Sequence, residues 1–216
     1  MSGLIYDAIE RYTDRFYKPL NEDFEKLRRF GEENHFAIIT RDTENFLLSL
    51  LAVKRPESIL EIGSSIGYSA SLFAKFCGAR VDTIERDSER ARAAINNFEE
   101  LGLGGLVRLY EGEACEILKG FAEEKRSYGF VFIDAAKSHY REFWDACMSL
   151  VHSGSIVVCD DVLFKGLVAS EPELPKRKHR TNVLKLREFL SYIHAFEGAD
   201  TRLFAVGDGL TVSVIR

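Results

Sequence analysis

The sequence predicts an α/β protein built on a doubly wound, Rossmann-like sheet, and three observations lead to this fold class. From residue 58 onward, short apolar runs alternate with helical patterns, which is typical of a largely parallel sheet covered by helices. A glycine- and serine-rich turn, Gly63 to Gly67, joins the first apolar run to the helix after it. Near the end of the chain, Gly207-Asp208-Gly209 separates two strand-like runs and carries an Asp-Gly hairpin signal. We therefore expect a mostly parallel seven-stranded sheet with one antiparallel strand and with helices appended at the N-terminus.

Length and composition are those of a single ordinary globular domain. The chain has 216 residues, of which 46% are hydrophobic and 29% charged, and its formal net charge is −5. We divide this domain into an N-terminal helical cap (1–55) and a Rossmann-like core (56–216). The acidic balance argues against indiscriminate nucleic-acid binding. No apolar stretch approaches the roughly 18 residues of a membrane span, no signal peptide pattern opens the chain and no Cys-x-x-Cys motif occurs, so we expect a cytoplasmic protein without a membrane partner.

The first 55 residues show apolar positions at helical spacing and contain no predicted strand of the sheet. Residues 4–34 form two predicted helices separated by Pro19, and a third helix is predicted over 42–53. Because these helices have apolar faces and no place in the sheet, we expect them to lie over it or across a partner subunit. Their predicted role is a homodimer interface and part of the wall of the substrate site.

The remaining elements alternate along the chain. The predicted strands are 58–62, 80–84, 106–110, 130–133, 156–159, 201–206 and 210–215. The predicted helices between them are 69–76, 88–101, 115–124, 139–150 and 182–195.

The turn after the first strand and an acid after the second indicate a nucleotide-like ligand. Glycines that end a strand and feed a helix N-terminus place free backbone N–H groups where such ligands bind in open α/β folds. Glu85 follows the second strand about 20 residues beyond the first glycine, where a carboxylate can bind ribose hydroxyls. Ser65 breaks the nicotinamide fingerprint and no Walker lysine follows. The pattern is usual in S-adenosylmethionine (SAM) methyltransferases; the alternative is a plain turn with a solvent-facing glutamate.

Three aspartates follow two later strands: Asp134 comes after one, and Asp160 and Asp161 come after the next. The carboxyl ends of neighbouring strands converge beside the cofactor crevice of a doubly wound sheet. Carboxylates crowded together raise one another's pKa unless a cation holds them. Oxygen ligands suit Mg²⁺, Mn²⁺ or Ca²⁺, and no His/Cys set points to structural zinc. The alternative is that these acids are helix caps or solvated turn residues.

Lys137 lies three residues after Asp134, beyond two small alanines that keep the turn close to the site. A divalent cation nearby disfavours the ammonium form, so this lysine can become a general base. Without the metal site, a solvated surface lysine would be the better interpretation.

Four stretches carry a resemblance to a known family: ILEIGSSIGYSA, FVFIDAAKSHY, VVCDDVLFKGLV and VGDGLTVS. Together they resemble the cation-dependent O-methyltransferases of the catechol and caffeoyl-CoA type over about residues 35 to 216. The resemblance implies that Asp134, Asp160 and Asp161 hold the metal ion, and that Lys137 and Asp134 are catalytic. It also implies a SAM site made of Ile38, Gly63, Tyr68, Ser69, Glu85, Glu113 and Asp134.

Two positions depart from the family's usual pattern. Asp161 stands where the family usually has asparagine, and the extra charge is expected to alter metal binding. Glu113 stands where relatives commonly carry an aspartate near the adenine.

Within the family, the chain looks most similar to the bacterial tRNA 5-hydroxyuridine methyltransferases. The similarity rests on Asp161 to Val168 and on the basic run that follows, Lys176 to Arg180. It implies methylation of wobble 5-hydroxyuridine, whose hydroxyl and neighbouring carbonyl form a vicinal oxygen pair like that of a catechol. The residues expected to contact the anticodon loop are Lys165, Lys176, Arg177, Lys178 and Arg180. Pro172 and Pro175 place the run in a predicted loop.

Three alternatives stay open. The same chemistry can act on a free catechol or another small vicinal-diol phenol. The basic run can be an ordinary solvated face. The protein can also be a SAM-binding scaffold without catalysis.

Overall fold

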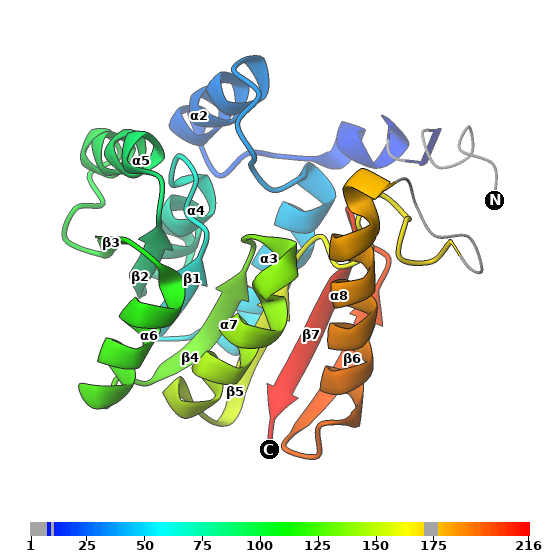
Figure 1. Cartoon of the computed structure of the whole chain (residues 1–216). Helices are drawn as coiled ribbons and strands as arrows, with labels where there is room; N and C mark the ends of the chain where they lie inside the picture. The colour runs from blue at the N-terminus through cyan, green and yellow to red at the C-terminus, as the bar shows by residue number, and fades with distance from the viewer. Residues whose placement is uncertain (1–7, 10, 171–176) are drawn as a thin grey trace.

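The computed structural model describes residues 8–9, 11–170 and 177–216, and its centre is one seven-stranded sheet. The strand order is β3-β2-β1-β4-β5-β7-β6 (Figure 1). The strands are β1 (Ser58–Ile62), β2 (Arg80–Glu85), β3 (Val107–Glu111), β4 (Tyr128–Ile133), β5 (Val151–Cys159), β6 (Ala199–Phe204) and β7 (Leu210–Ile215). The first five pair in parallel, whereas β7 is antiparallel to both of its neighbours. The predicted fold class, with its single antiparallel strand, is confirmed.

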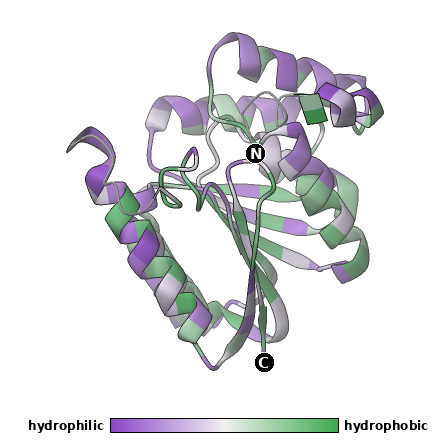
Figure 2. Cartoon of the chain, turned by 90° about the vertical axis from the view of Figure 1, so that its right-hand side faces the viewer, coloured by the Kyte–Doolittle hydropathy of each residue, from purple (hydrophilic) through white to green (hydrophobic). Residues whose placement is uncertain are grey.

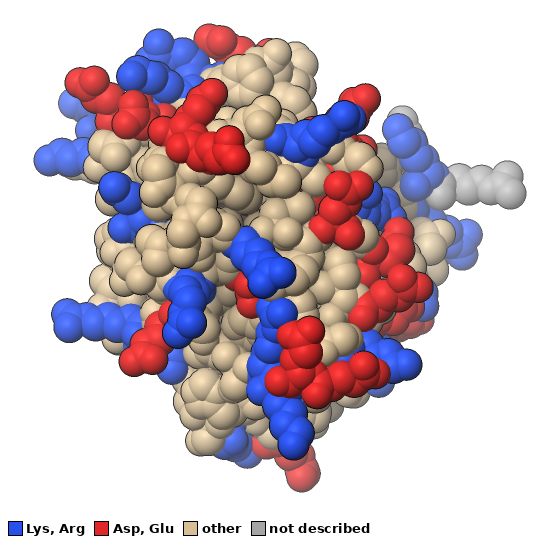
Figure 3. Space-filling model, turned by 90° about the vertical axis from the view of Figure 1, so that its left-hand side faces the viewer, with Lys and Arg blue, Asp and Glu red and all other residues tan. Residues whose placement is uncertain are grey.

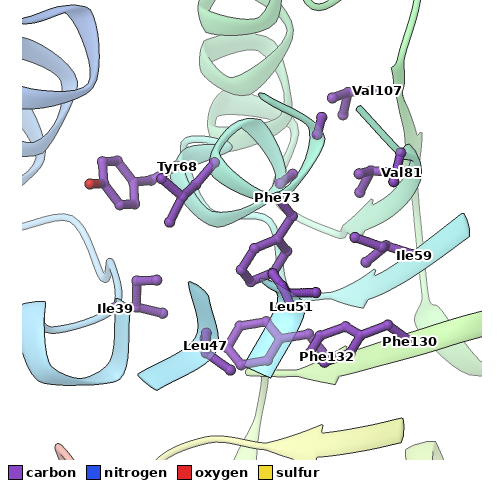
Figure 4. Packing of buried hydrophobic residues seen from close by; sticks show 14 of the residues in the cluster. Ile39, Leu47, Leu51, Ile59, Tyr68, Phe73, Val81, Val107, Phe130 and Phe132 are labelled. Carbon is purple, nitrogen blue, oxygen red and sulfur yellow. The ribbon is translucent and has the colours of Figure 1, made fainter. Parts of the chain in front are cut away.

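Helices cover both faces of this sheet, as the two views in Figures 1 and 2 show. One face carries α3 (Arg41–Lys54), α4 (Tyr68–Cys77) and α5 (Ser88–Glu100), and the other carries α6 (Ala114–Glu123), α7 (Tyr140–Cys147) and α8 (Arg177–Ala195). Because the central strands are buried on both sides, their apolar residues alternate between two cores. Ile59 and Phe132 face the α3 side (Figure 4), while Leu60 and Val131 face the α7 side.

The N-terminal segment contributes to this architecture in two ways. Leu47 and Leu51 of α3 are fully buried against the sheet, so this helix is one of the layers that cover it. The helix α2 (Glu22–Glu33) begins at an Asn21 cap and packs on α4, where the Phe24 and Tyr68 ring centroids are 6.2 Å apart. Before it, the described residues include a short 3-10 turn, η1 (Asp14–Phe16). The N-terminal segment therefore reaches the edge of the sheet where β1 ends.

Some predicted boundaries differ from the structure. The helix α8 begins at Arg177, not at residue 182, so the basic residues 177–180 form its first turn and the predicted loop is wrong for them. Arginine and lysine are good helix formers. The start of the helix was missed because residues 177–182 contain no apolar side chain, so no helical periodicity is visible before Val183. The predicted helix over 139–150 is divided into η2 (Lys137–His139), α7 and η3 (Met148–Leu150). Lys176, Pro172, Pro175 and the first residues of the predicted N-terminal helix lie outside the described residues.

In the part of the chain that the structure describes, no helix is both long enough and apolar enough to cross a membrane. The four cysteines are free thiols; Cys115 is exposed, whereas Cys147 and Cys159 are buried.

Candidate active site

A cavity of about 640 Å³ opens at the carboxyl ends of the parallel strands, a size ordinary for a nucleoside cofactor and a small acceptor. The loops after β1 to β5 form its floor, and the segment 37–40 before α3 closes another side. Ten predicted site residues border this single cavity: Ile38, Gly63, Tyr68, Ser69, Glu85, Glu113, Asp134, Lys137, Asp160 and Asp161. The topology has therefore brought together residues that are up to 123 positions apart in the chain, from Ile38 to Asp161.

The glycine turn after β1 is built for close backbone approach. Gly63 has φ +101°, and a Cβ there would lie 2.0 Å from the carbonyl oxygen of Asp134, so no other residue fits. The first of the predicted free N–H groups are paired within the fold, however. The amides of Gly63 and Ser64 both donate to the carbonyl of Ile84, at 3.0 and 3.2 Å. The turn thus joins the ends of β1 and β2, and its first two amides donate within the fold, so they are not available to a ligand.

Glu85 ends β2 with its carboxylate fixed by three backbone amides. The N–H groups of Ser65, Arg86 and Asp87 donate to it at 2.8, 2.9 and 3.0 Å. The side chain is nearly buried yet borders the cavity. A carboxylate held in this way at the second strand end can accept hydrogen bonds from a ribose, as the sequence predicts.

The three aspartates meet at the ends of β4 and β5, with Lys137 among them. Its Nζ lies 2.8 Å from Oδ1 of Asp134 and 3.0 Å from Oδ2 of Asp161. Asp160 accepts a hydrogen bond from the backbone N–H of Asp161 at 2.7 Å and is only 3% exposed. Asp161 itself has φ +56°, a left-handed conformation that aspartate and asparagine tolerate better than most residues.

Burial and mutual repulsion both act against negative charge in this cluster. Burial, followed by the charges of Asp134 and Asp161, raises the pKa of Asp160 well above its usual range. Burial also raises the pKa of Asp134, and Asp161 adds to the rise although Lys137 opposes it. One ammonium group therefore does not balance three carboxylates in a site that is mostly shielded from water.

Lys137 is a protonated cation in this arrangement. Burial works against its charge, but Tyr140, Asp134 and Asp161 together raise its pKa far above the usual value. A lysine in this state donates hydrogen bonds and cannot accept a proton. The predicted base needs the charge of the neighbouring carboxylates to be neutralised before it can act.

The donor set suits a hard divalent cation, although the described residues contain no ready-made group of three His, Cys, Asp or Glu ligands around one point. Lys137 draws Asp134 and Asp161 onto its own Nζ. The crowding of three carboxyl groups is the observation that favours a cation, because a bound positive charge relieves the repulsion and lets the groups stay ionised.

The cavity also fits SAM. Its rim combines the fixed Glu85 carboxylate with buried polar atoms that have no hydrogen-bond partner among the described residues, including Oγ of Ser64 and of Ser65. Sequence reasoning did not single out these serines, or Phe143 and His139, which also border the cavity. It likewise missed Glu61, which is fully buried in β1 and has one carboxylate oxygen, Oε1, without a partner. The signal in the sequence was a charged residue inside an apolar strand.

Three of the predicted RNA-binding residues lie outside the cavity. Lys165, Lys178 and Arg180 are exposed and do not line it. The first turn of α8 is nevertheless near the site, because the rings of His179 and Phe164 pack edge-on at 5.6 Å and α8 lies against η2. Lys176 and the side chain of Arg177 fall outside what the structure describes.

A mostly parallel sheet with a crevice at its carboxyl edge, a ribose-type acid on β2 and an aspartate cluster on β4 and β5 defines a Rossmann-like protein with a nucleoside-cofactor site. Comparison with known proteins identifies the family. The sequence model of the O-methyltransferase family matches residues 17–215, and the chain belongs to this family. The prediction of a SAM-dependent O-methyltransferase is therefore confirmed.

Individual relatives agree with this assignment. Caffeoyl-CoA O-methyltransferase 5 of Nicotiana tabacum is 27% identical, with 95% of this chain and 90% of the relative covered. Caffeoyl-CoA O-methyltransferase 2 of Petunia hybrida is 28% identical, with 95% and 89% covered. A crystal structure from Staphylococcus aureus, provisionally assigned as a caffeoyl-CoA O-methyltransferase, superimposes with a TM-score of 0.90 at 29% identity and covers 97% of this chain and 100% of that one.

Proposed function

We propose that the protein transfers a methyl group from SAM to a hydroxyl group of an acceptor with two vicinal oxygens, as in a catechol, with the help of a divalent cation. The observation that carries this proposal is the shared cavity. The ribose-type acid Glu85, the aspartate cluster and Lys137 all border it. A cofactor held at Glu85 and an acceptor held at the aspartates would then face each other across one enclosed space.

The residues of the chain have distinct roles in this scheme. SAM supplies an electrophilic methyl group, and Glu85 holds its ribose while Gly63 allows the backbone to lie close. Asp134, Asp160 and Asp161 would hold the cation, with Mg²⁺ as the first choice and Mn²⁺ or Ca²⁺ as alternatives. When bound, such a cation lowers the pKa of a hydroxyl that it chelates. Lys137 receives the hydroxyl proton at Nζ, because its pKa falls once the charges that raise it are neutralised.

A small phenolic acceptor is the leading substrate class. The support comes from relatives that are named caffeoyl-CoA O-methyltransferases and that match almost the whole chain. The cavity itself also favours a small acceptor, since about 640 Å³ holds a nucleoside cofactor with limited space beside it.

A second candidate is 5-hydroxyuridine at the wobble position of tRNA. The favouring observation is that the basic first turn of α8 contacts Phe164, three residues beyond Asp161 at the cavity. The face shown in Figure 3, at the β3 edge, instead mixes both signs of charge. Exposed Lys178 and Arg180 could bind anticodon-loop phosphates while a splayed base enters the cavity.

Methyl transfer from labelled SAM, followed by product mass spectrometry, tests these proposals. The acceptors are a catechol, caffeoyl-CoA and tRNA that carries 5-hydroxyuridine, each with Mg²⁺ and with EDTA. We expect a methylated product that disappears with EDTA. Activity that ignores EDTA would remove the metal role, and a product from tRNA alone would replace the small acceptor by the second candidate.

Charge reversal separates the two substrate classes. Lys178→Glu/Arg180→Glu should abolish turnover of tRNA and leave turnover of a catechol unchanged. The matched control is Lys75→Glu/Lys119→Glu, which reverses two exposed charges on other helices. If tRNA turnover survives the first change, the RNA role of this turn is wrong.

We also propose that the chain forms a homodimer through its N-terminal region. The support is that Ile9, Tyr12 and Phe16 are 54%, 57% and 67% exposed, an unusual density of open apolar side chains. Light scattering at micromolar concentration checks this proposal, and a monomeric mass would remove it.

A further inference from the structure

A buried arginine lies behind the wall of the cofactor cavity. Arg28 on α2 is 1% exposed, and its guanidinium group donates hydrogen bonds in four directions. Nη2 donates to Oε2 of Glu44, Nη1 donates to the carbonyl of Ile39 at 3.0 Å, and Nε donates to the hydroxyls of Tyr68 and Tyr17 at 3.1 and 3.2 Å.

Glu44 on α3 completes the network from the other side. It is fully buried and accepts hydrogen bonds from the hydroxyls of Tyr68 and Tyr17, at 2.7 and 3.0 Å. Burial opposes the positive charge of Arg28, yet the neighbouring Tyr68 and Glu44 raise its pKa, so it stays charged. Both buried charges and both hydroxyls are therefore hydrogen-bonded, and on its outer side Nη1 of Arg28 also lies 3.5 Å from Oε1 of the partly exposed Glu32.

Two of the groups that this cluster holds belong to the cavity wall. Ile39 and Tyr68 both border the cavity, whereas Arg28, Glu44 and Tyr17 do not. Figure 4 shows the Tyr68 ring projecting from α4 with its hydroxyl turned away from the apolar cluster around Phe73. Because this hydroxyl donates to Glu44, the network fixes the Tyr68 side chain at the cavity wall, and the hydroxyl proton is used within the network.

The segment of the cavity wall before α3, residues 36–40, is held by side-chain hydrogen bonds. Residues 36–40 have no helix or strand of their own, so no ladder of backbone hydrogen bonds holds them over the cavity. The bond from Arg28 to the Ile39 carbonyl fixes the middle of this segment, and the Thr40 cap of α3 fixes its end. A buried ion pair alone is a weak source of stability, since apolar residues of similar volume often serve as well.

We propose that Arg28 and Glu44 are positioning residues of the cofactor site, which hold segment 37–40 and the Tyr68 ring in the arrangement that binds SAM. The network would then act on cofactor affinity through Ile39 and Tyr68, without touching the cofactor. It would also link the N-terminal segment, through Tyr17, to the same wall.

The test compares stability with cofactor affinity, because a merely structural pair would affect only stability. We would measure the Kd of S-adenosylhomocysteine by calorimetry and the unfolding midpoint for Arg28→Met, Glu44→Gln and the double variant Arg28→Met/Glu44→Leu. The single variants should weaken binding by about tenfold or more. The double variant should recover much of the midpoint, because no buried charge is left unpaired, and should still bind weakly.

A matched control and a milder variant complete the design. Arg126 and Asp82 form an ion pair at 3.0 Å whose residues do not line the cavity, so Arg126→Met/Asp82→Leu should leave the Kd unchanged. Tyr17→Phe removes one hydroxyl from the network and should weaken binding about threefold even if the larger changes prevent folding. Wild-type affinity in the double variant and in Tyr17→Phe would overturn the proposal.

Discussion

The molecule buries charges at two places, and they are built in opposite ways. Around Arg28, the guanidinium group meets the buried carboxylate of Glu44 and, at 3.5 Å, the partly exposed carboxylate of Glu32, which also pairs with Arg41 at 3.2 Å. Each carboxylate therefore has a cation, and hydroxyl and carbonyl partners take up the remaining hydrogen bonds of Arg28. At the ends of β4 and β5, three carboxylates share a single ammonium group, and the pKa values of Asp134 and Asp160 are raised. The first cluster is balanced, whereas the second is under repulsion.

This difference in charge balance indicates different roles for the two clusters: one positions neighbouring groups, and the other takes part in the chemistry. A balanced cluster has nothing to gain from a ligand, so its contribution is to hold the groups that it contacts. A repulsive cluster in a cavity is stabilised by any cation that enters, and such perturbed groups concentrate at functional sites. The two clusters also lie against the same cavity, one inside it and one behind its wall. Variants of the aspartate cluster should therefore lose activity, whereas variants of the Arg28 network should lose stability or cofactor affinity.

The largest expected effect is on the repulsive cluster. Lys137→Met should lower kcat by about 10²- to 10⁴-fold, the usual contribution of a general base. Stability should change less, because the two carboxylate partners of Lys137, Asp134 and Asp161, are 23% and 39% exposed and can be hydrated when the ammonium is removed. Steady-state kinetics with the best acceptor measures the change, and Lys119→Met, on the exposed face of α6, is the control. Unchanged kcat would remove Lys137 from the mechanism; an unmodified protein with no activity on any acceptor would instead favour the scaffold interpretation.

The balanced cluster should respond through stability. Arg28→Met leaves Glu44 charged and buried without its main partner, which should lower the free energy of unfolding by about 3–5 kcal/mol. The partly exposed pair of Arg126 and Asp82 provides the contrast, and Arg126→Met should cost much less there. Urea denaturation measures both values. Equal losses at the two pairs would contradict the distinction drawn from burial.

Glu61 tests a carboxylate that belongs to neither cluster. It is fully buried in β1, and burial raises its pKa from 4.5 to about 7 despite hydrogen bonds from Ser69 and Thr83. The folded state therefore keeps a proton that the unfolded chain releases between about pH 4.5 and 7. Since the folded state binds more protons in this window, the free energy of unfolding falls as pH rises through it, by an amount on the order of 3 kcal/mol.

Glu61→Gln removes this group from the titration. We expect the variant to lose less stability than the unmodified protein between about pH 5 and about pH 8. Urea denaturation of both proteins at both pH values gives the contribution of Glu61, which includes its electrostatic coupling to Asp134 and Glu85. An identical pH dependence would show that Glu61 is already ionised in the fold.

Much of this architecture could be predicted because local patterns specify it. Strand ends at Gly63, Glu85, Asp134 and Asp160 were visible as apolar runs that stop at a polar residue or glycine, and the topology of a doubly wound sheet then places those ends together. The pairing of the Gly63, Ser64 and Ser65 amides could not be predicted, because their partners, the Ile84 carbonyl and the Glu85 carboxylate, depend on strand pairing.

The network around Arg28 could not be predicted for a related reason. In the sequence, Arg28 is one of several charged residues on an amphipathic helix, and Glu44 sits in the first turn of another, where an acid is common. Only the packing of α2 on α4 removes Arg28 from water, and tertiary contacts between four separate segments give it partners. The protonation of Lys137 was missed likewise, since it follows from the distances to two carboxylates that lie 27 positions apart in the chain, Asp134 and Asp161.

The smallest effect expected at the repulsive cluster is that of Asp161→Asn. Asparagine tolerates the left-handed conformation at φ +56° as well as aspartate does, so the loop should keep its shape. The change removes one negative charge from the site and one of the two carboxylate partners of Lys137. Cation affinity should fall by about tenfold, because the charge count of the ligands sets the affinity of oxygen sites.

Calorimetric titration of Mg²⁺ or Mn²⁺ into the protein saturated with S-adenosylhomocysteine measures this affinity without turnover. Asp145→Asn, an exposed acid that pairs with Arg141 on α7, controls for a general loss of negative charge. Tighter cation binding by Asp161→Asn would contradict this prediction. It would mean that the Asp161 carboxylate of the wild-type protein serves mainly to keep Lys137 protonated, and that the positive charge of Lys137 repels the cation. The aspartate cluster would then resemble the Arg28 network, because in both a cationic side chain would hold the carboxylates. The two sites would differ only in how completely their charges are paired.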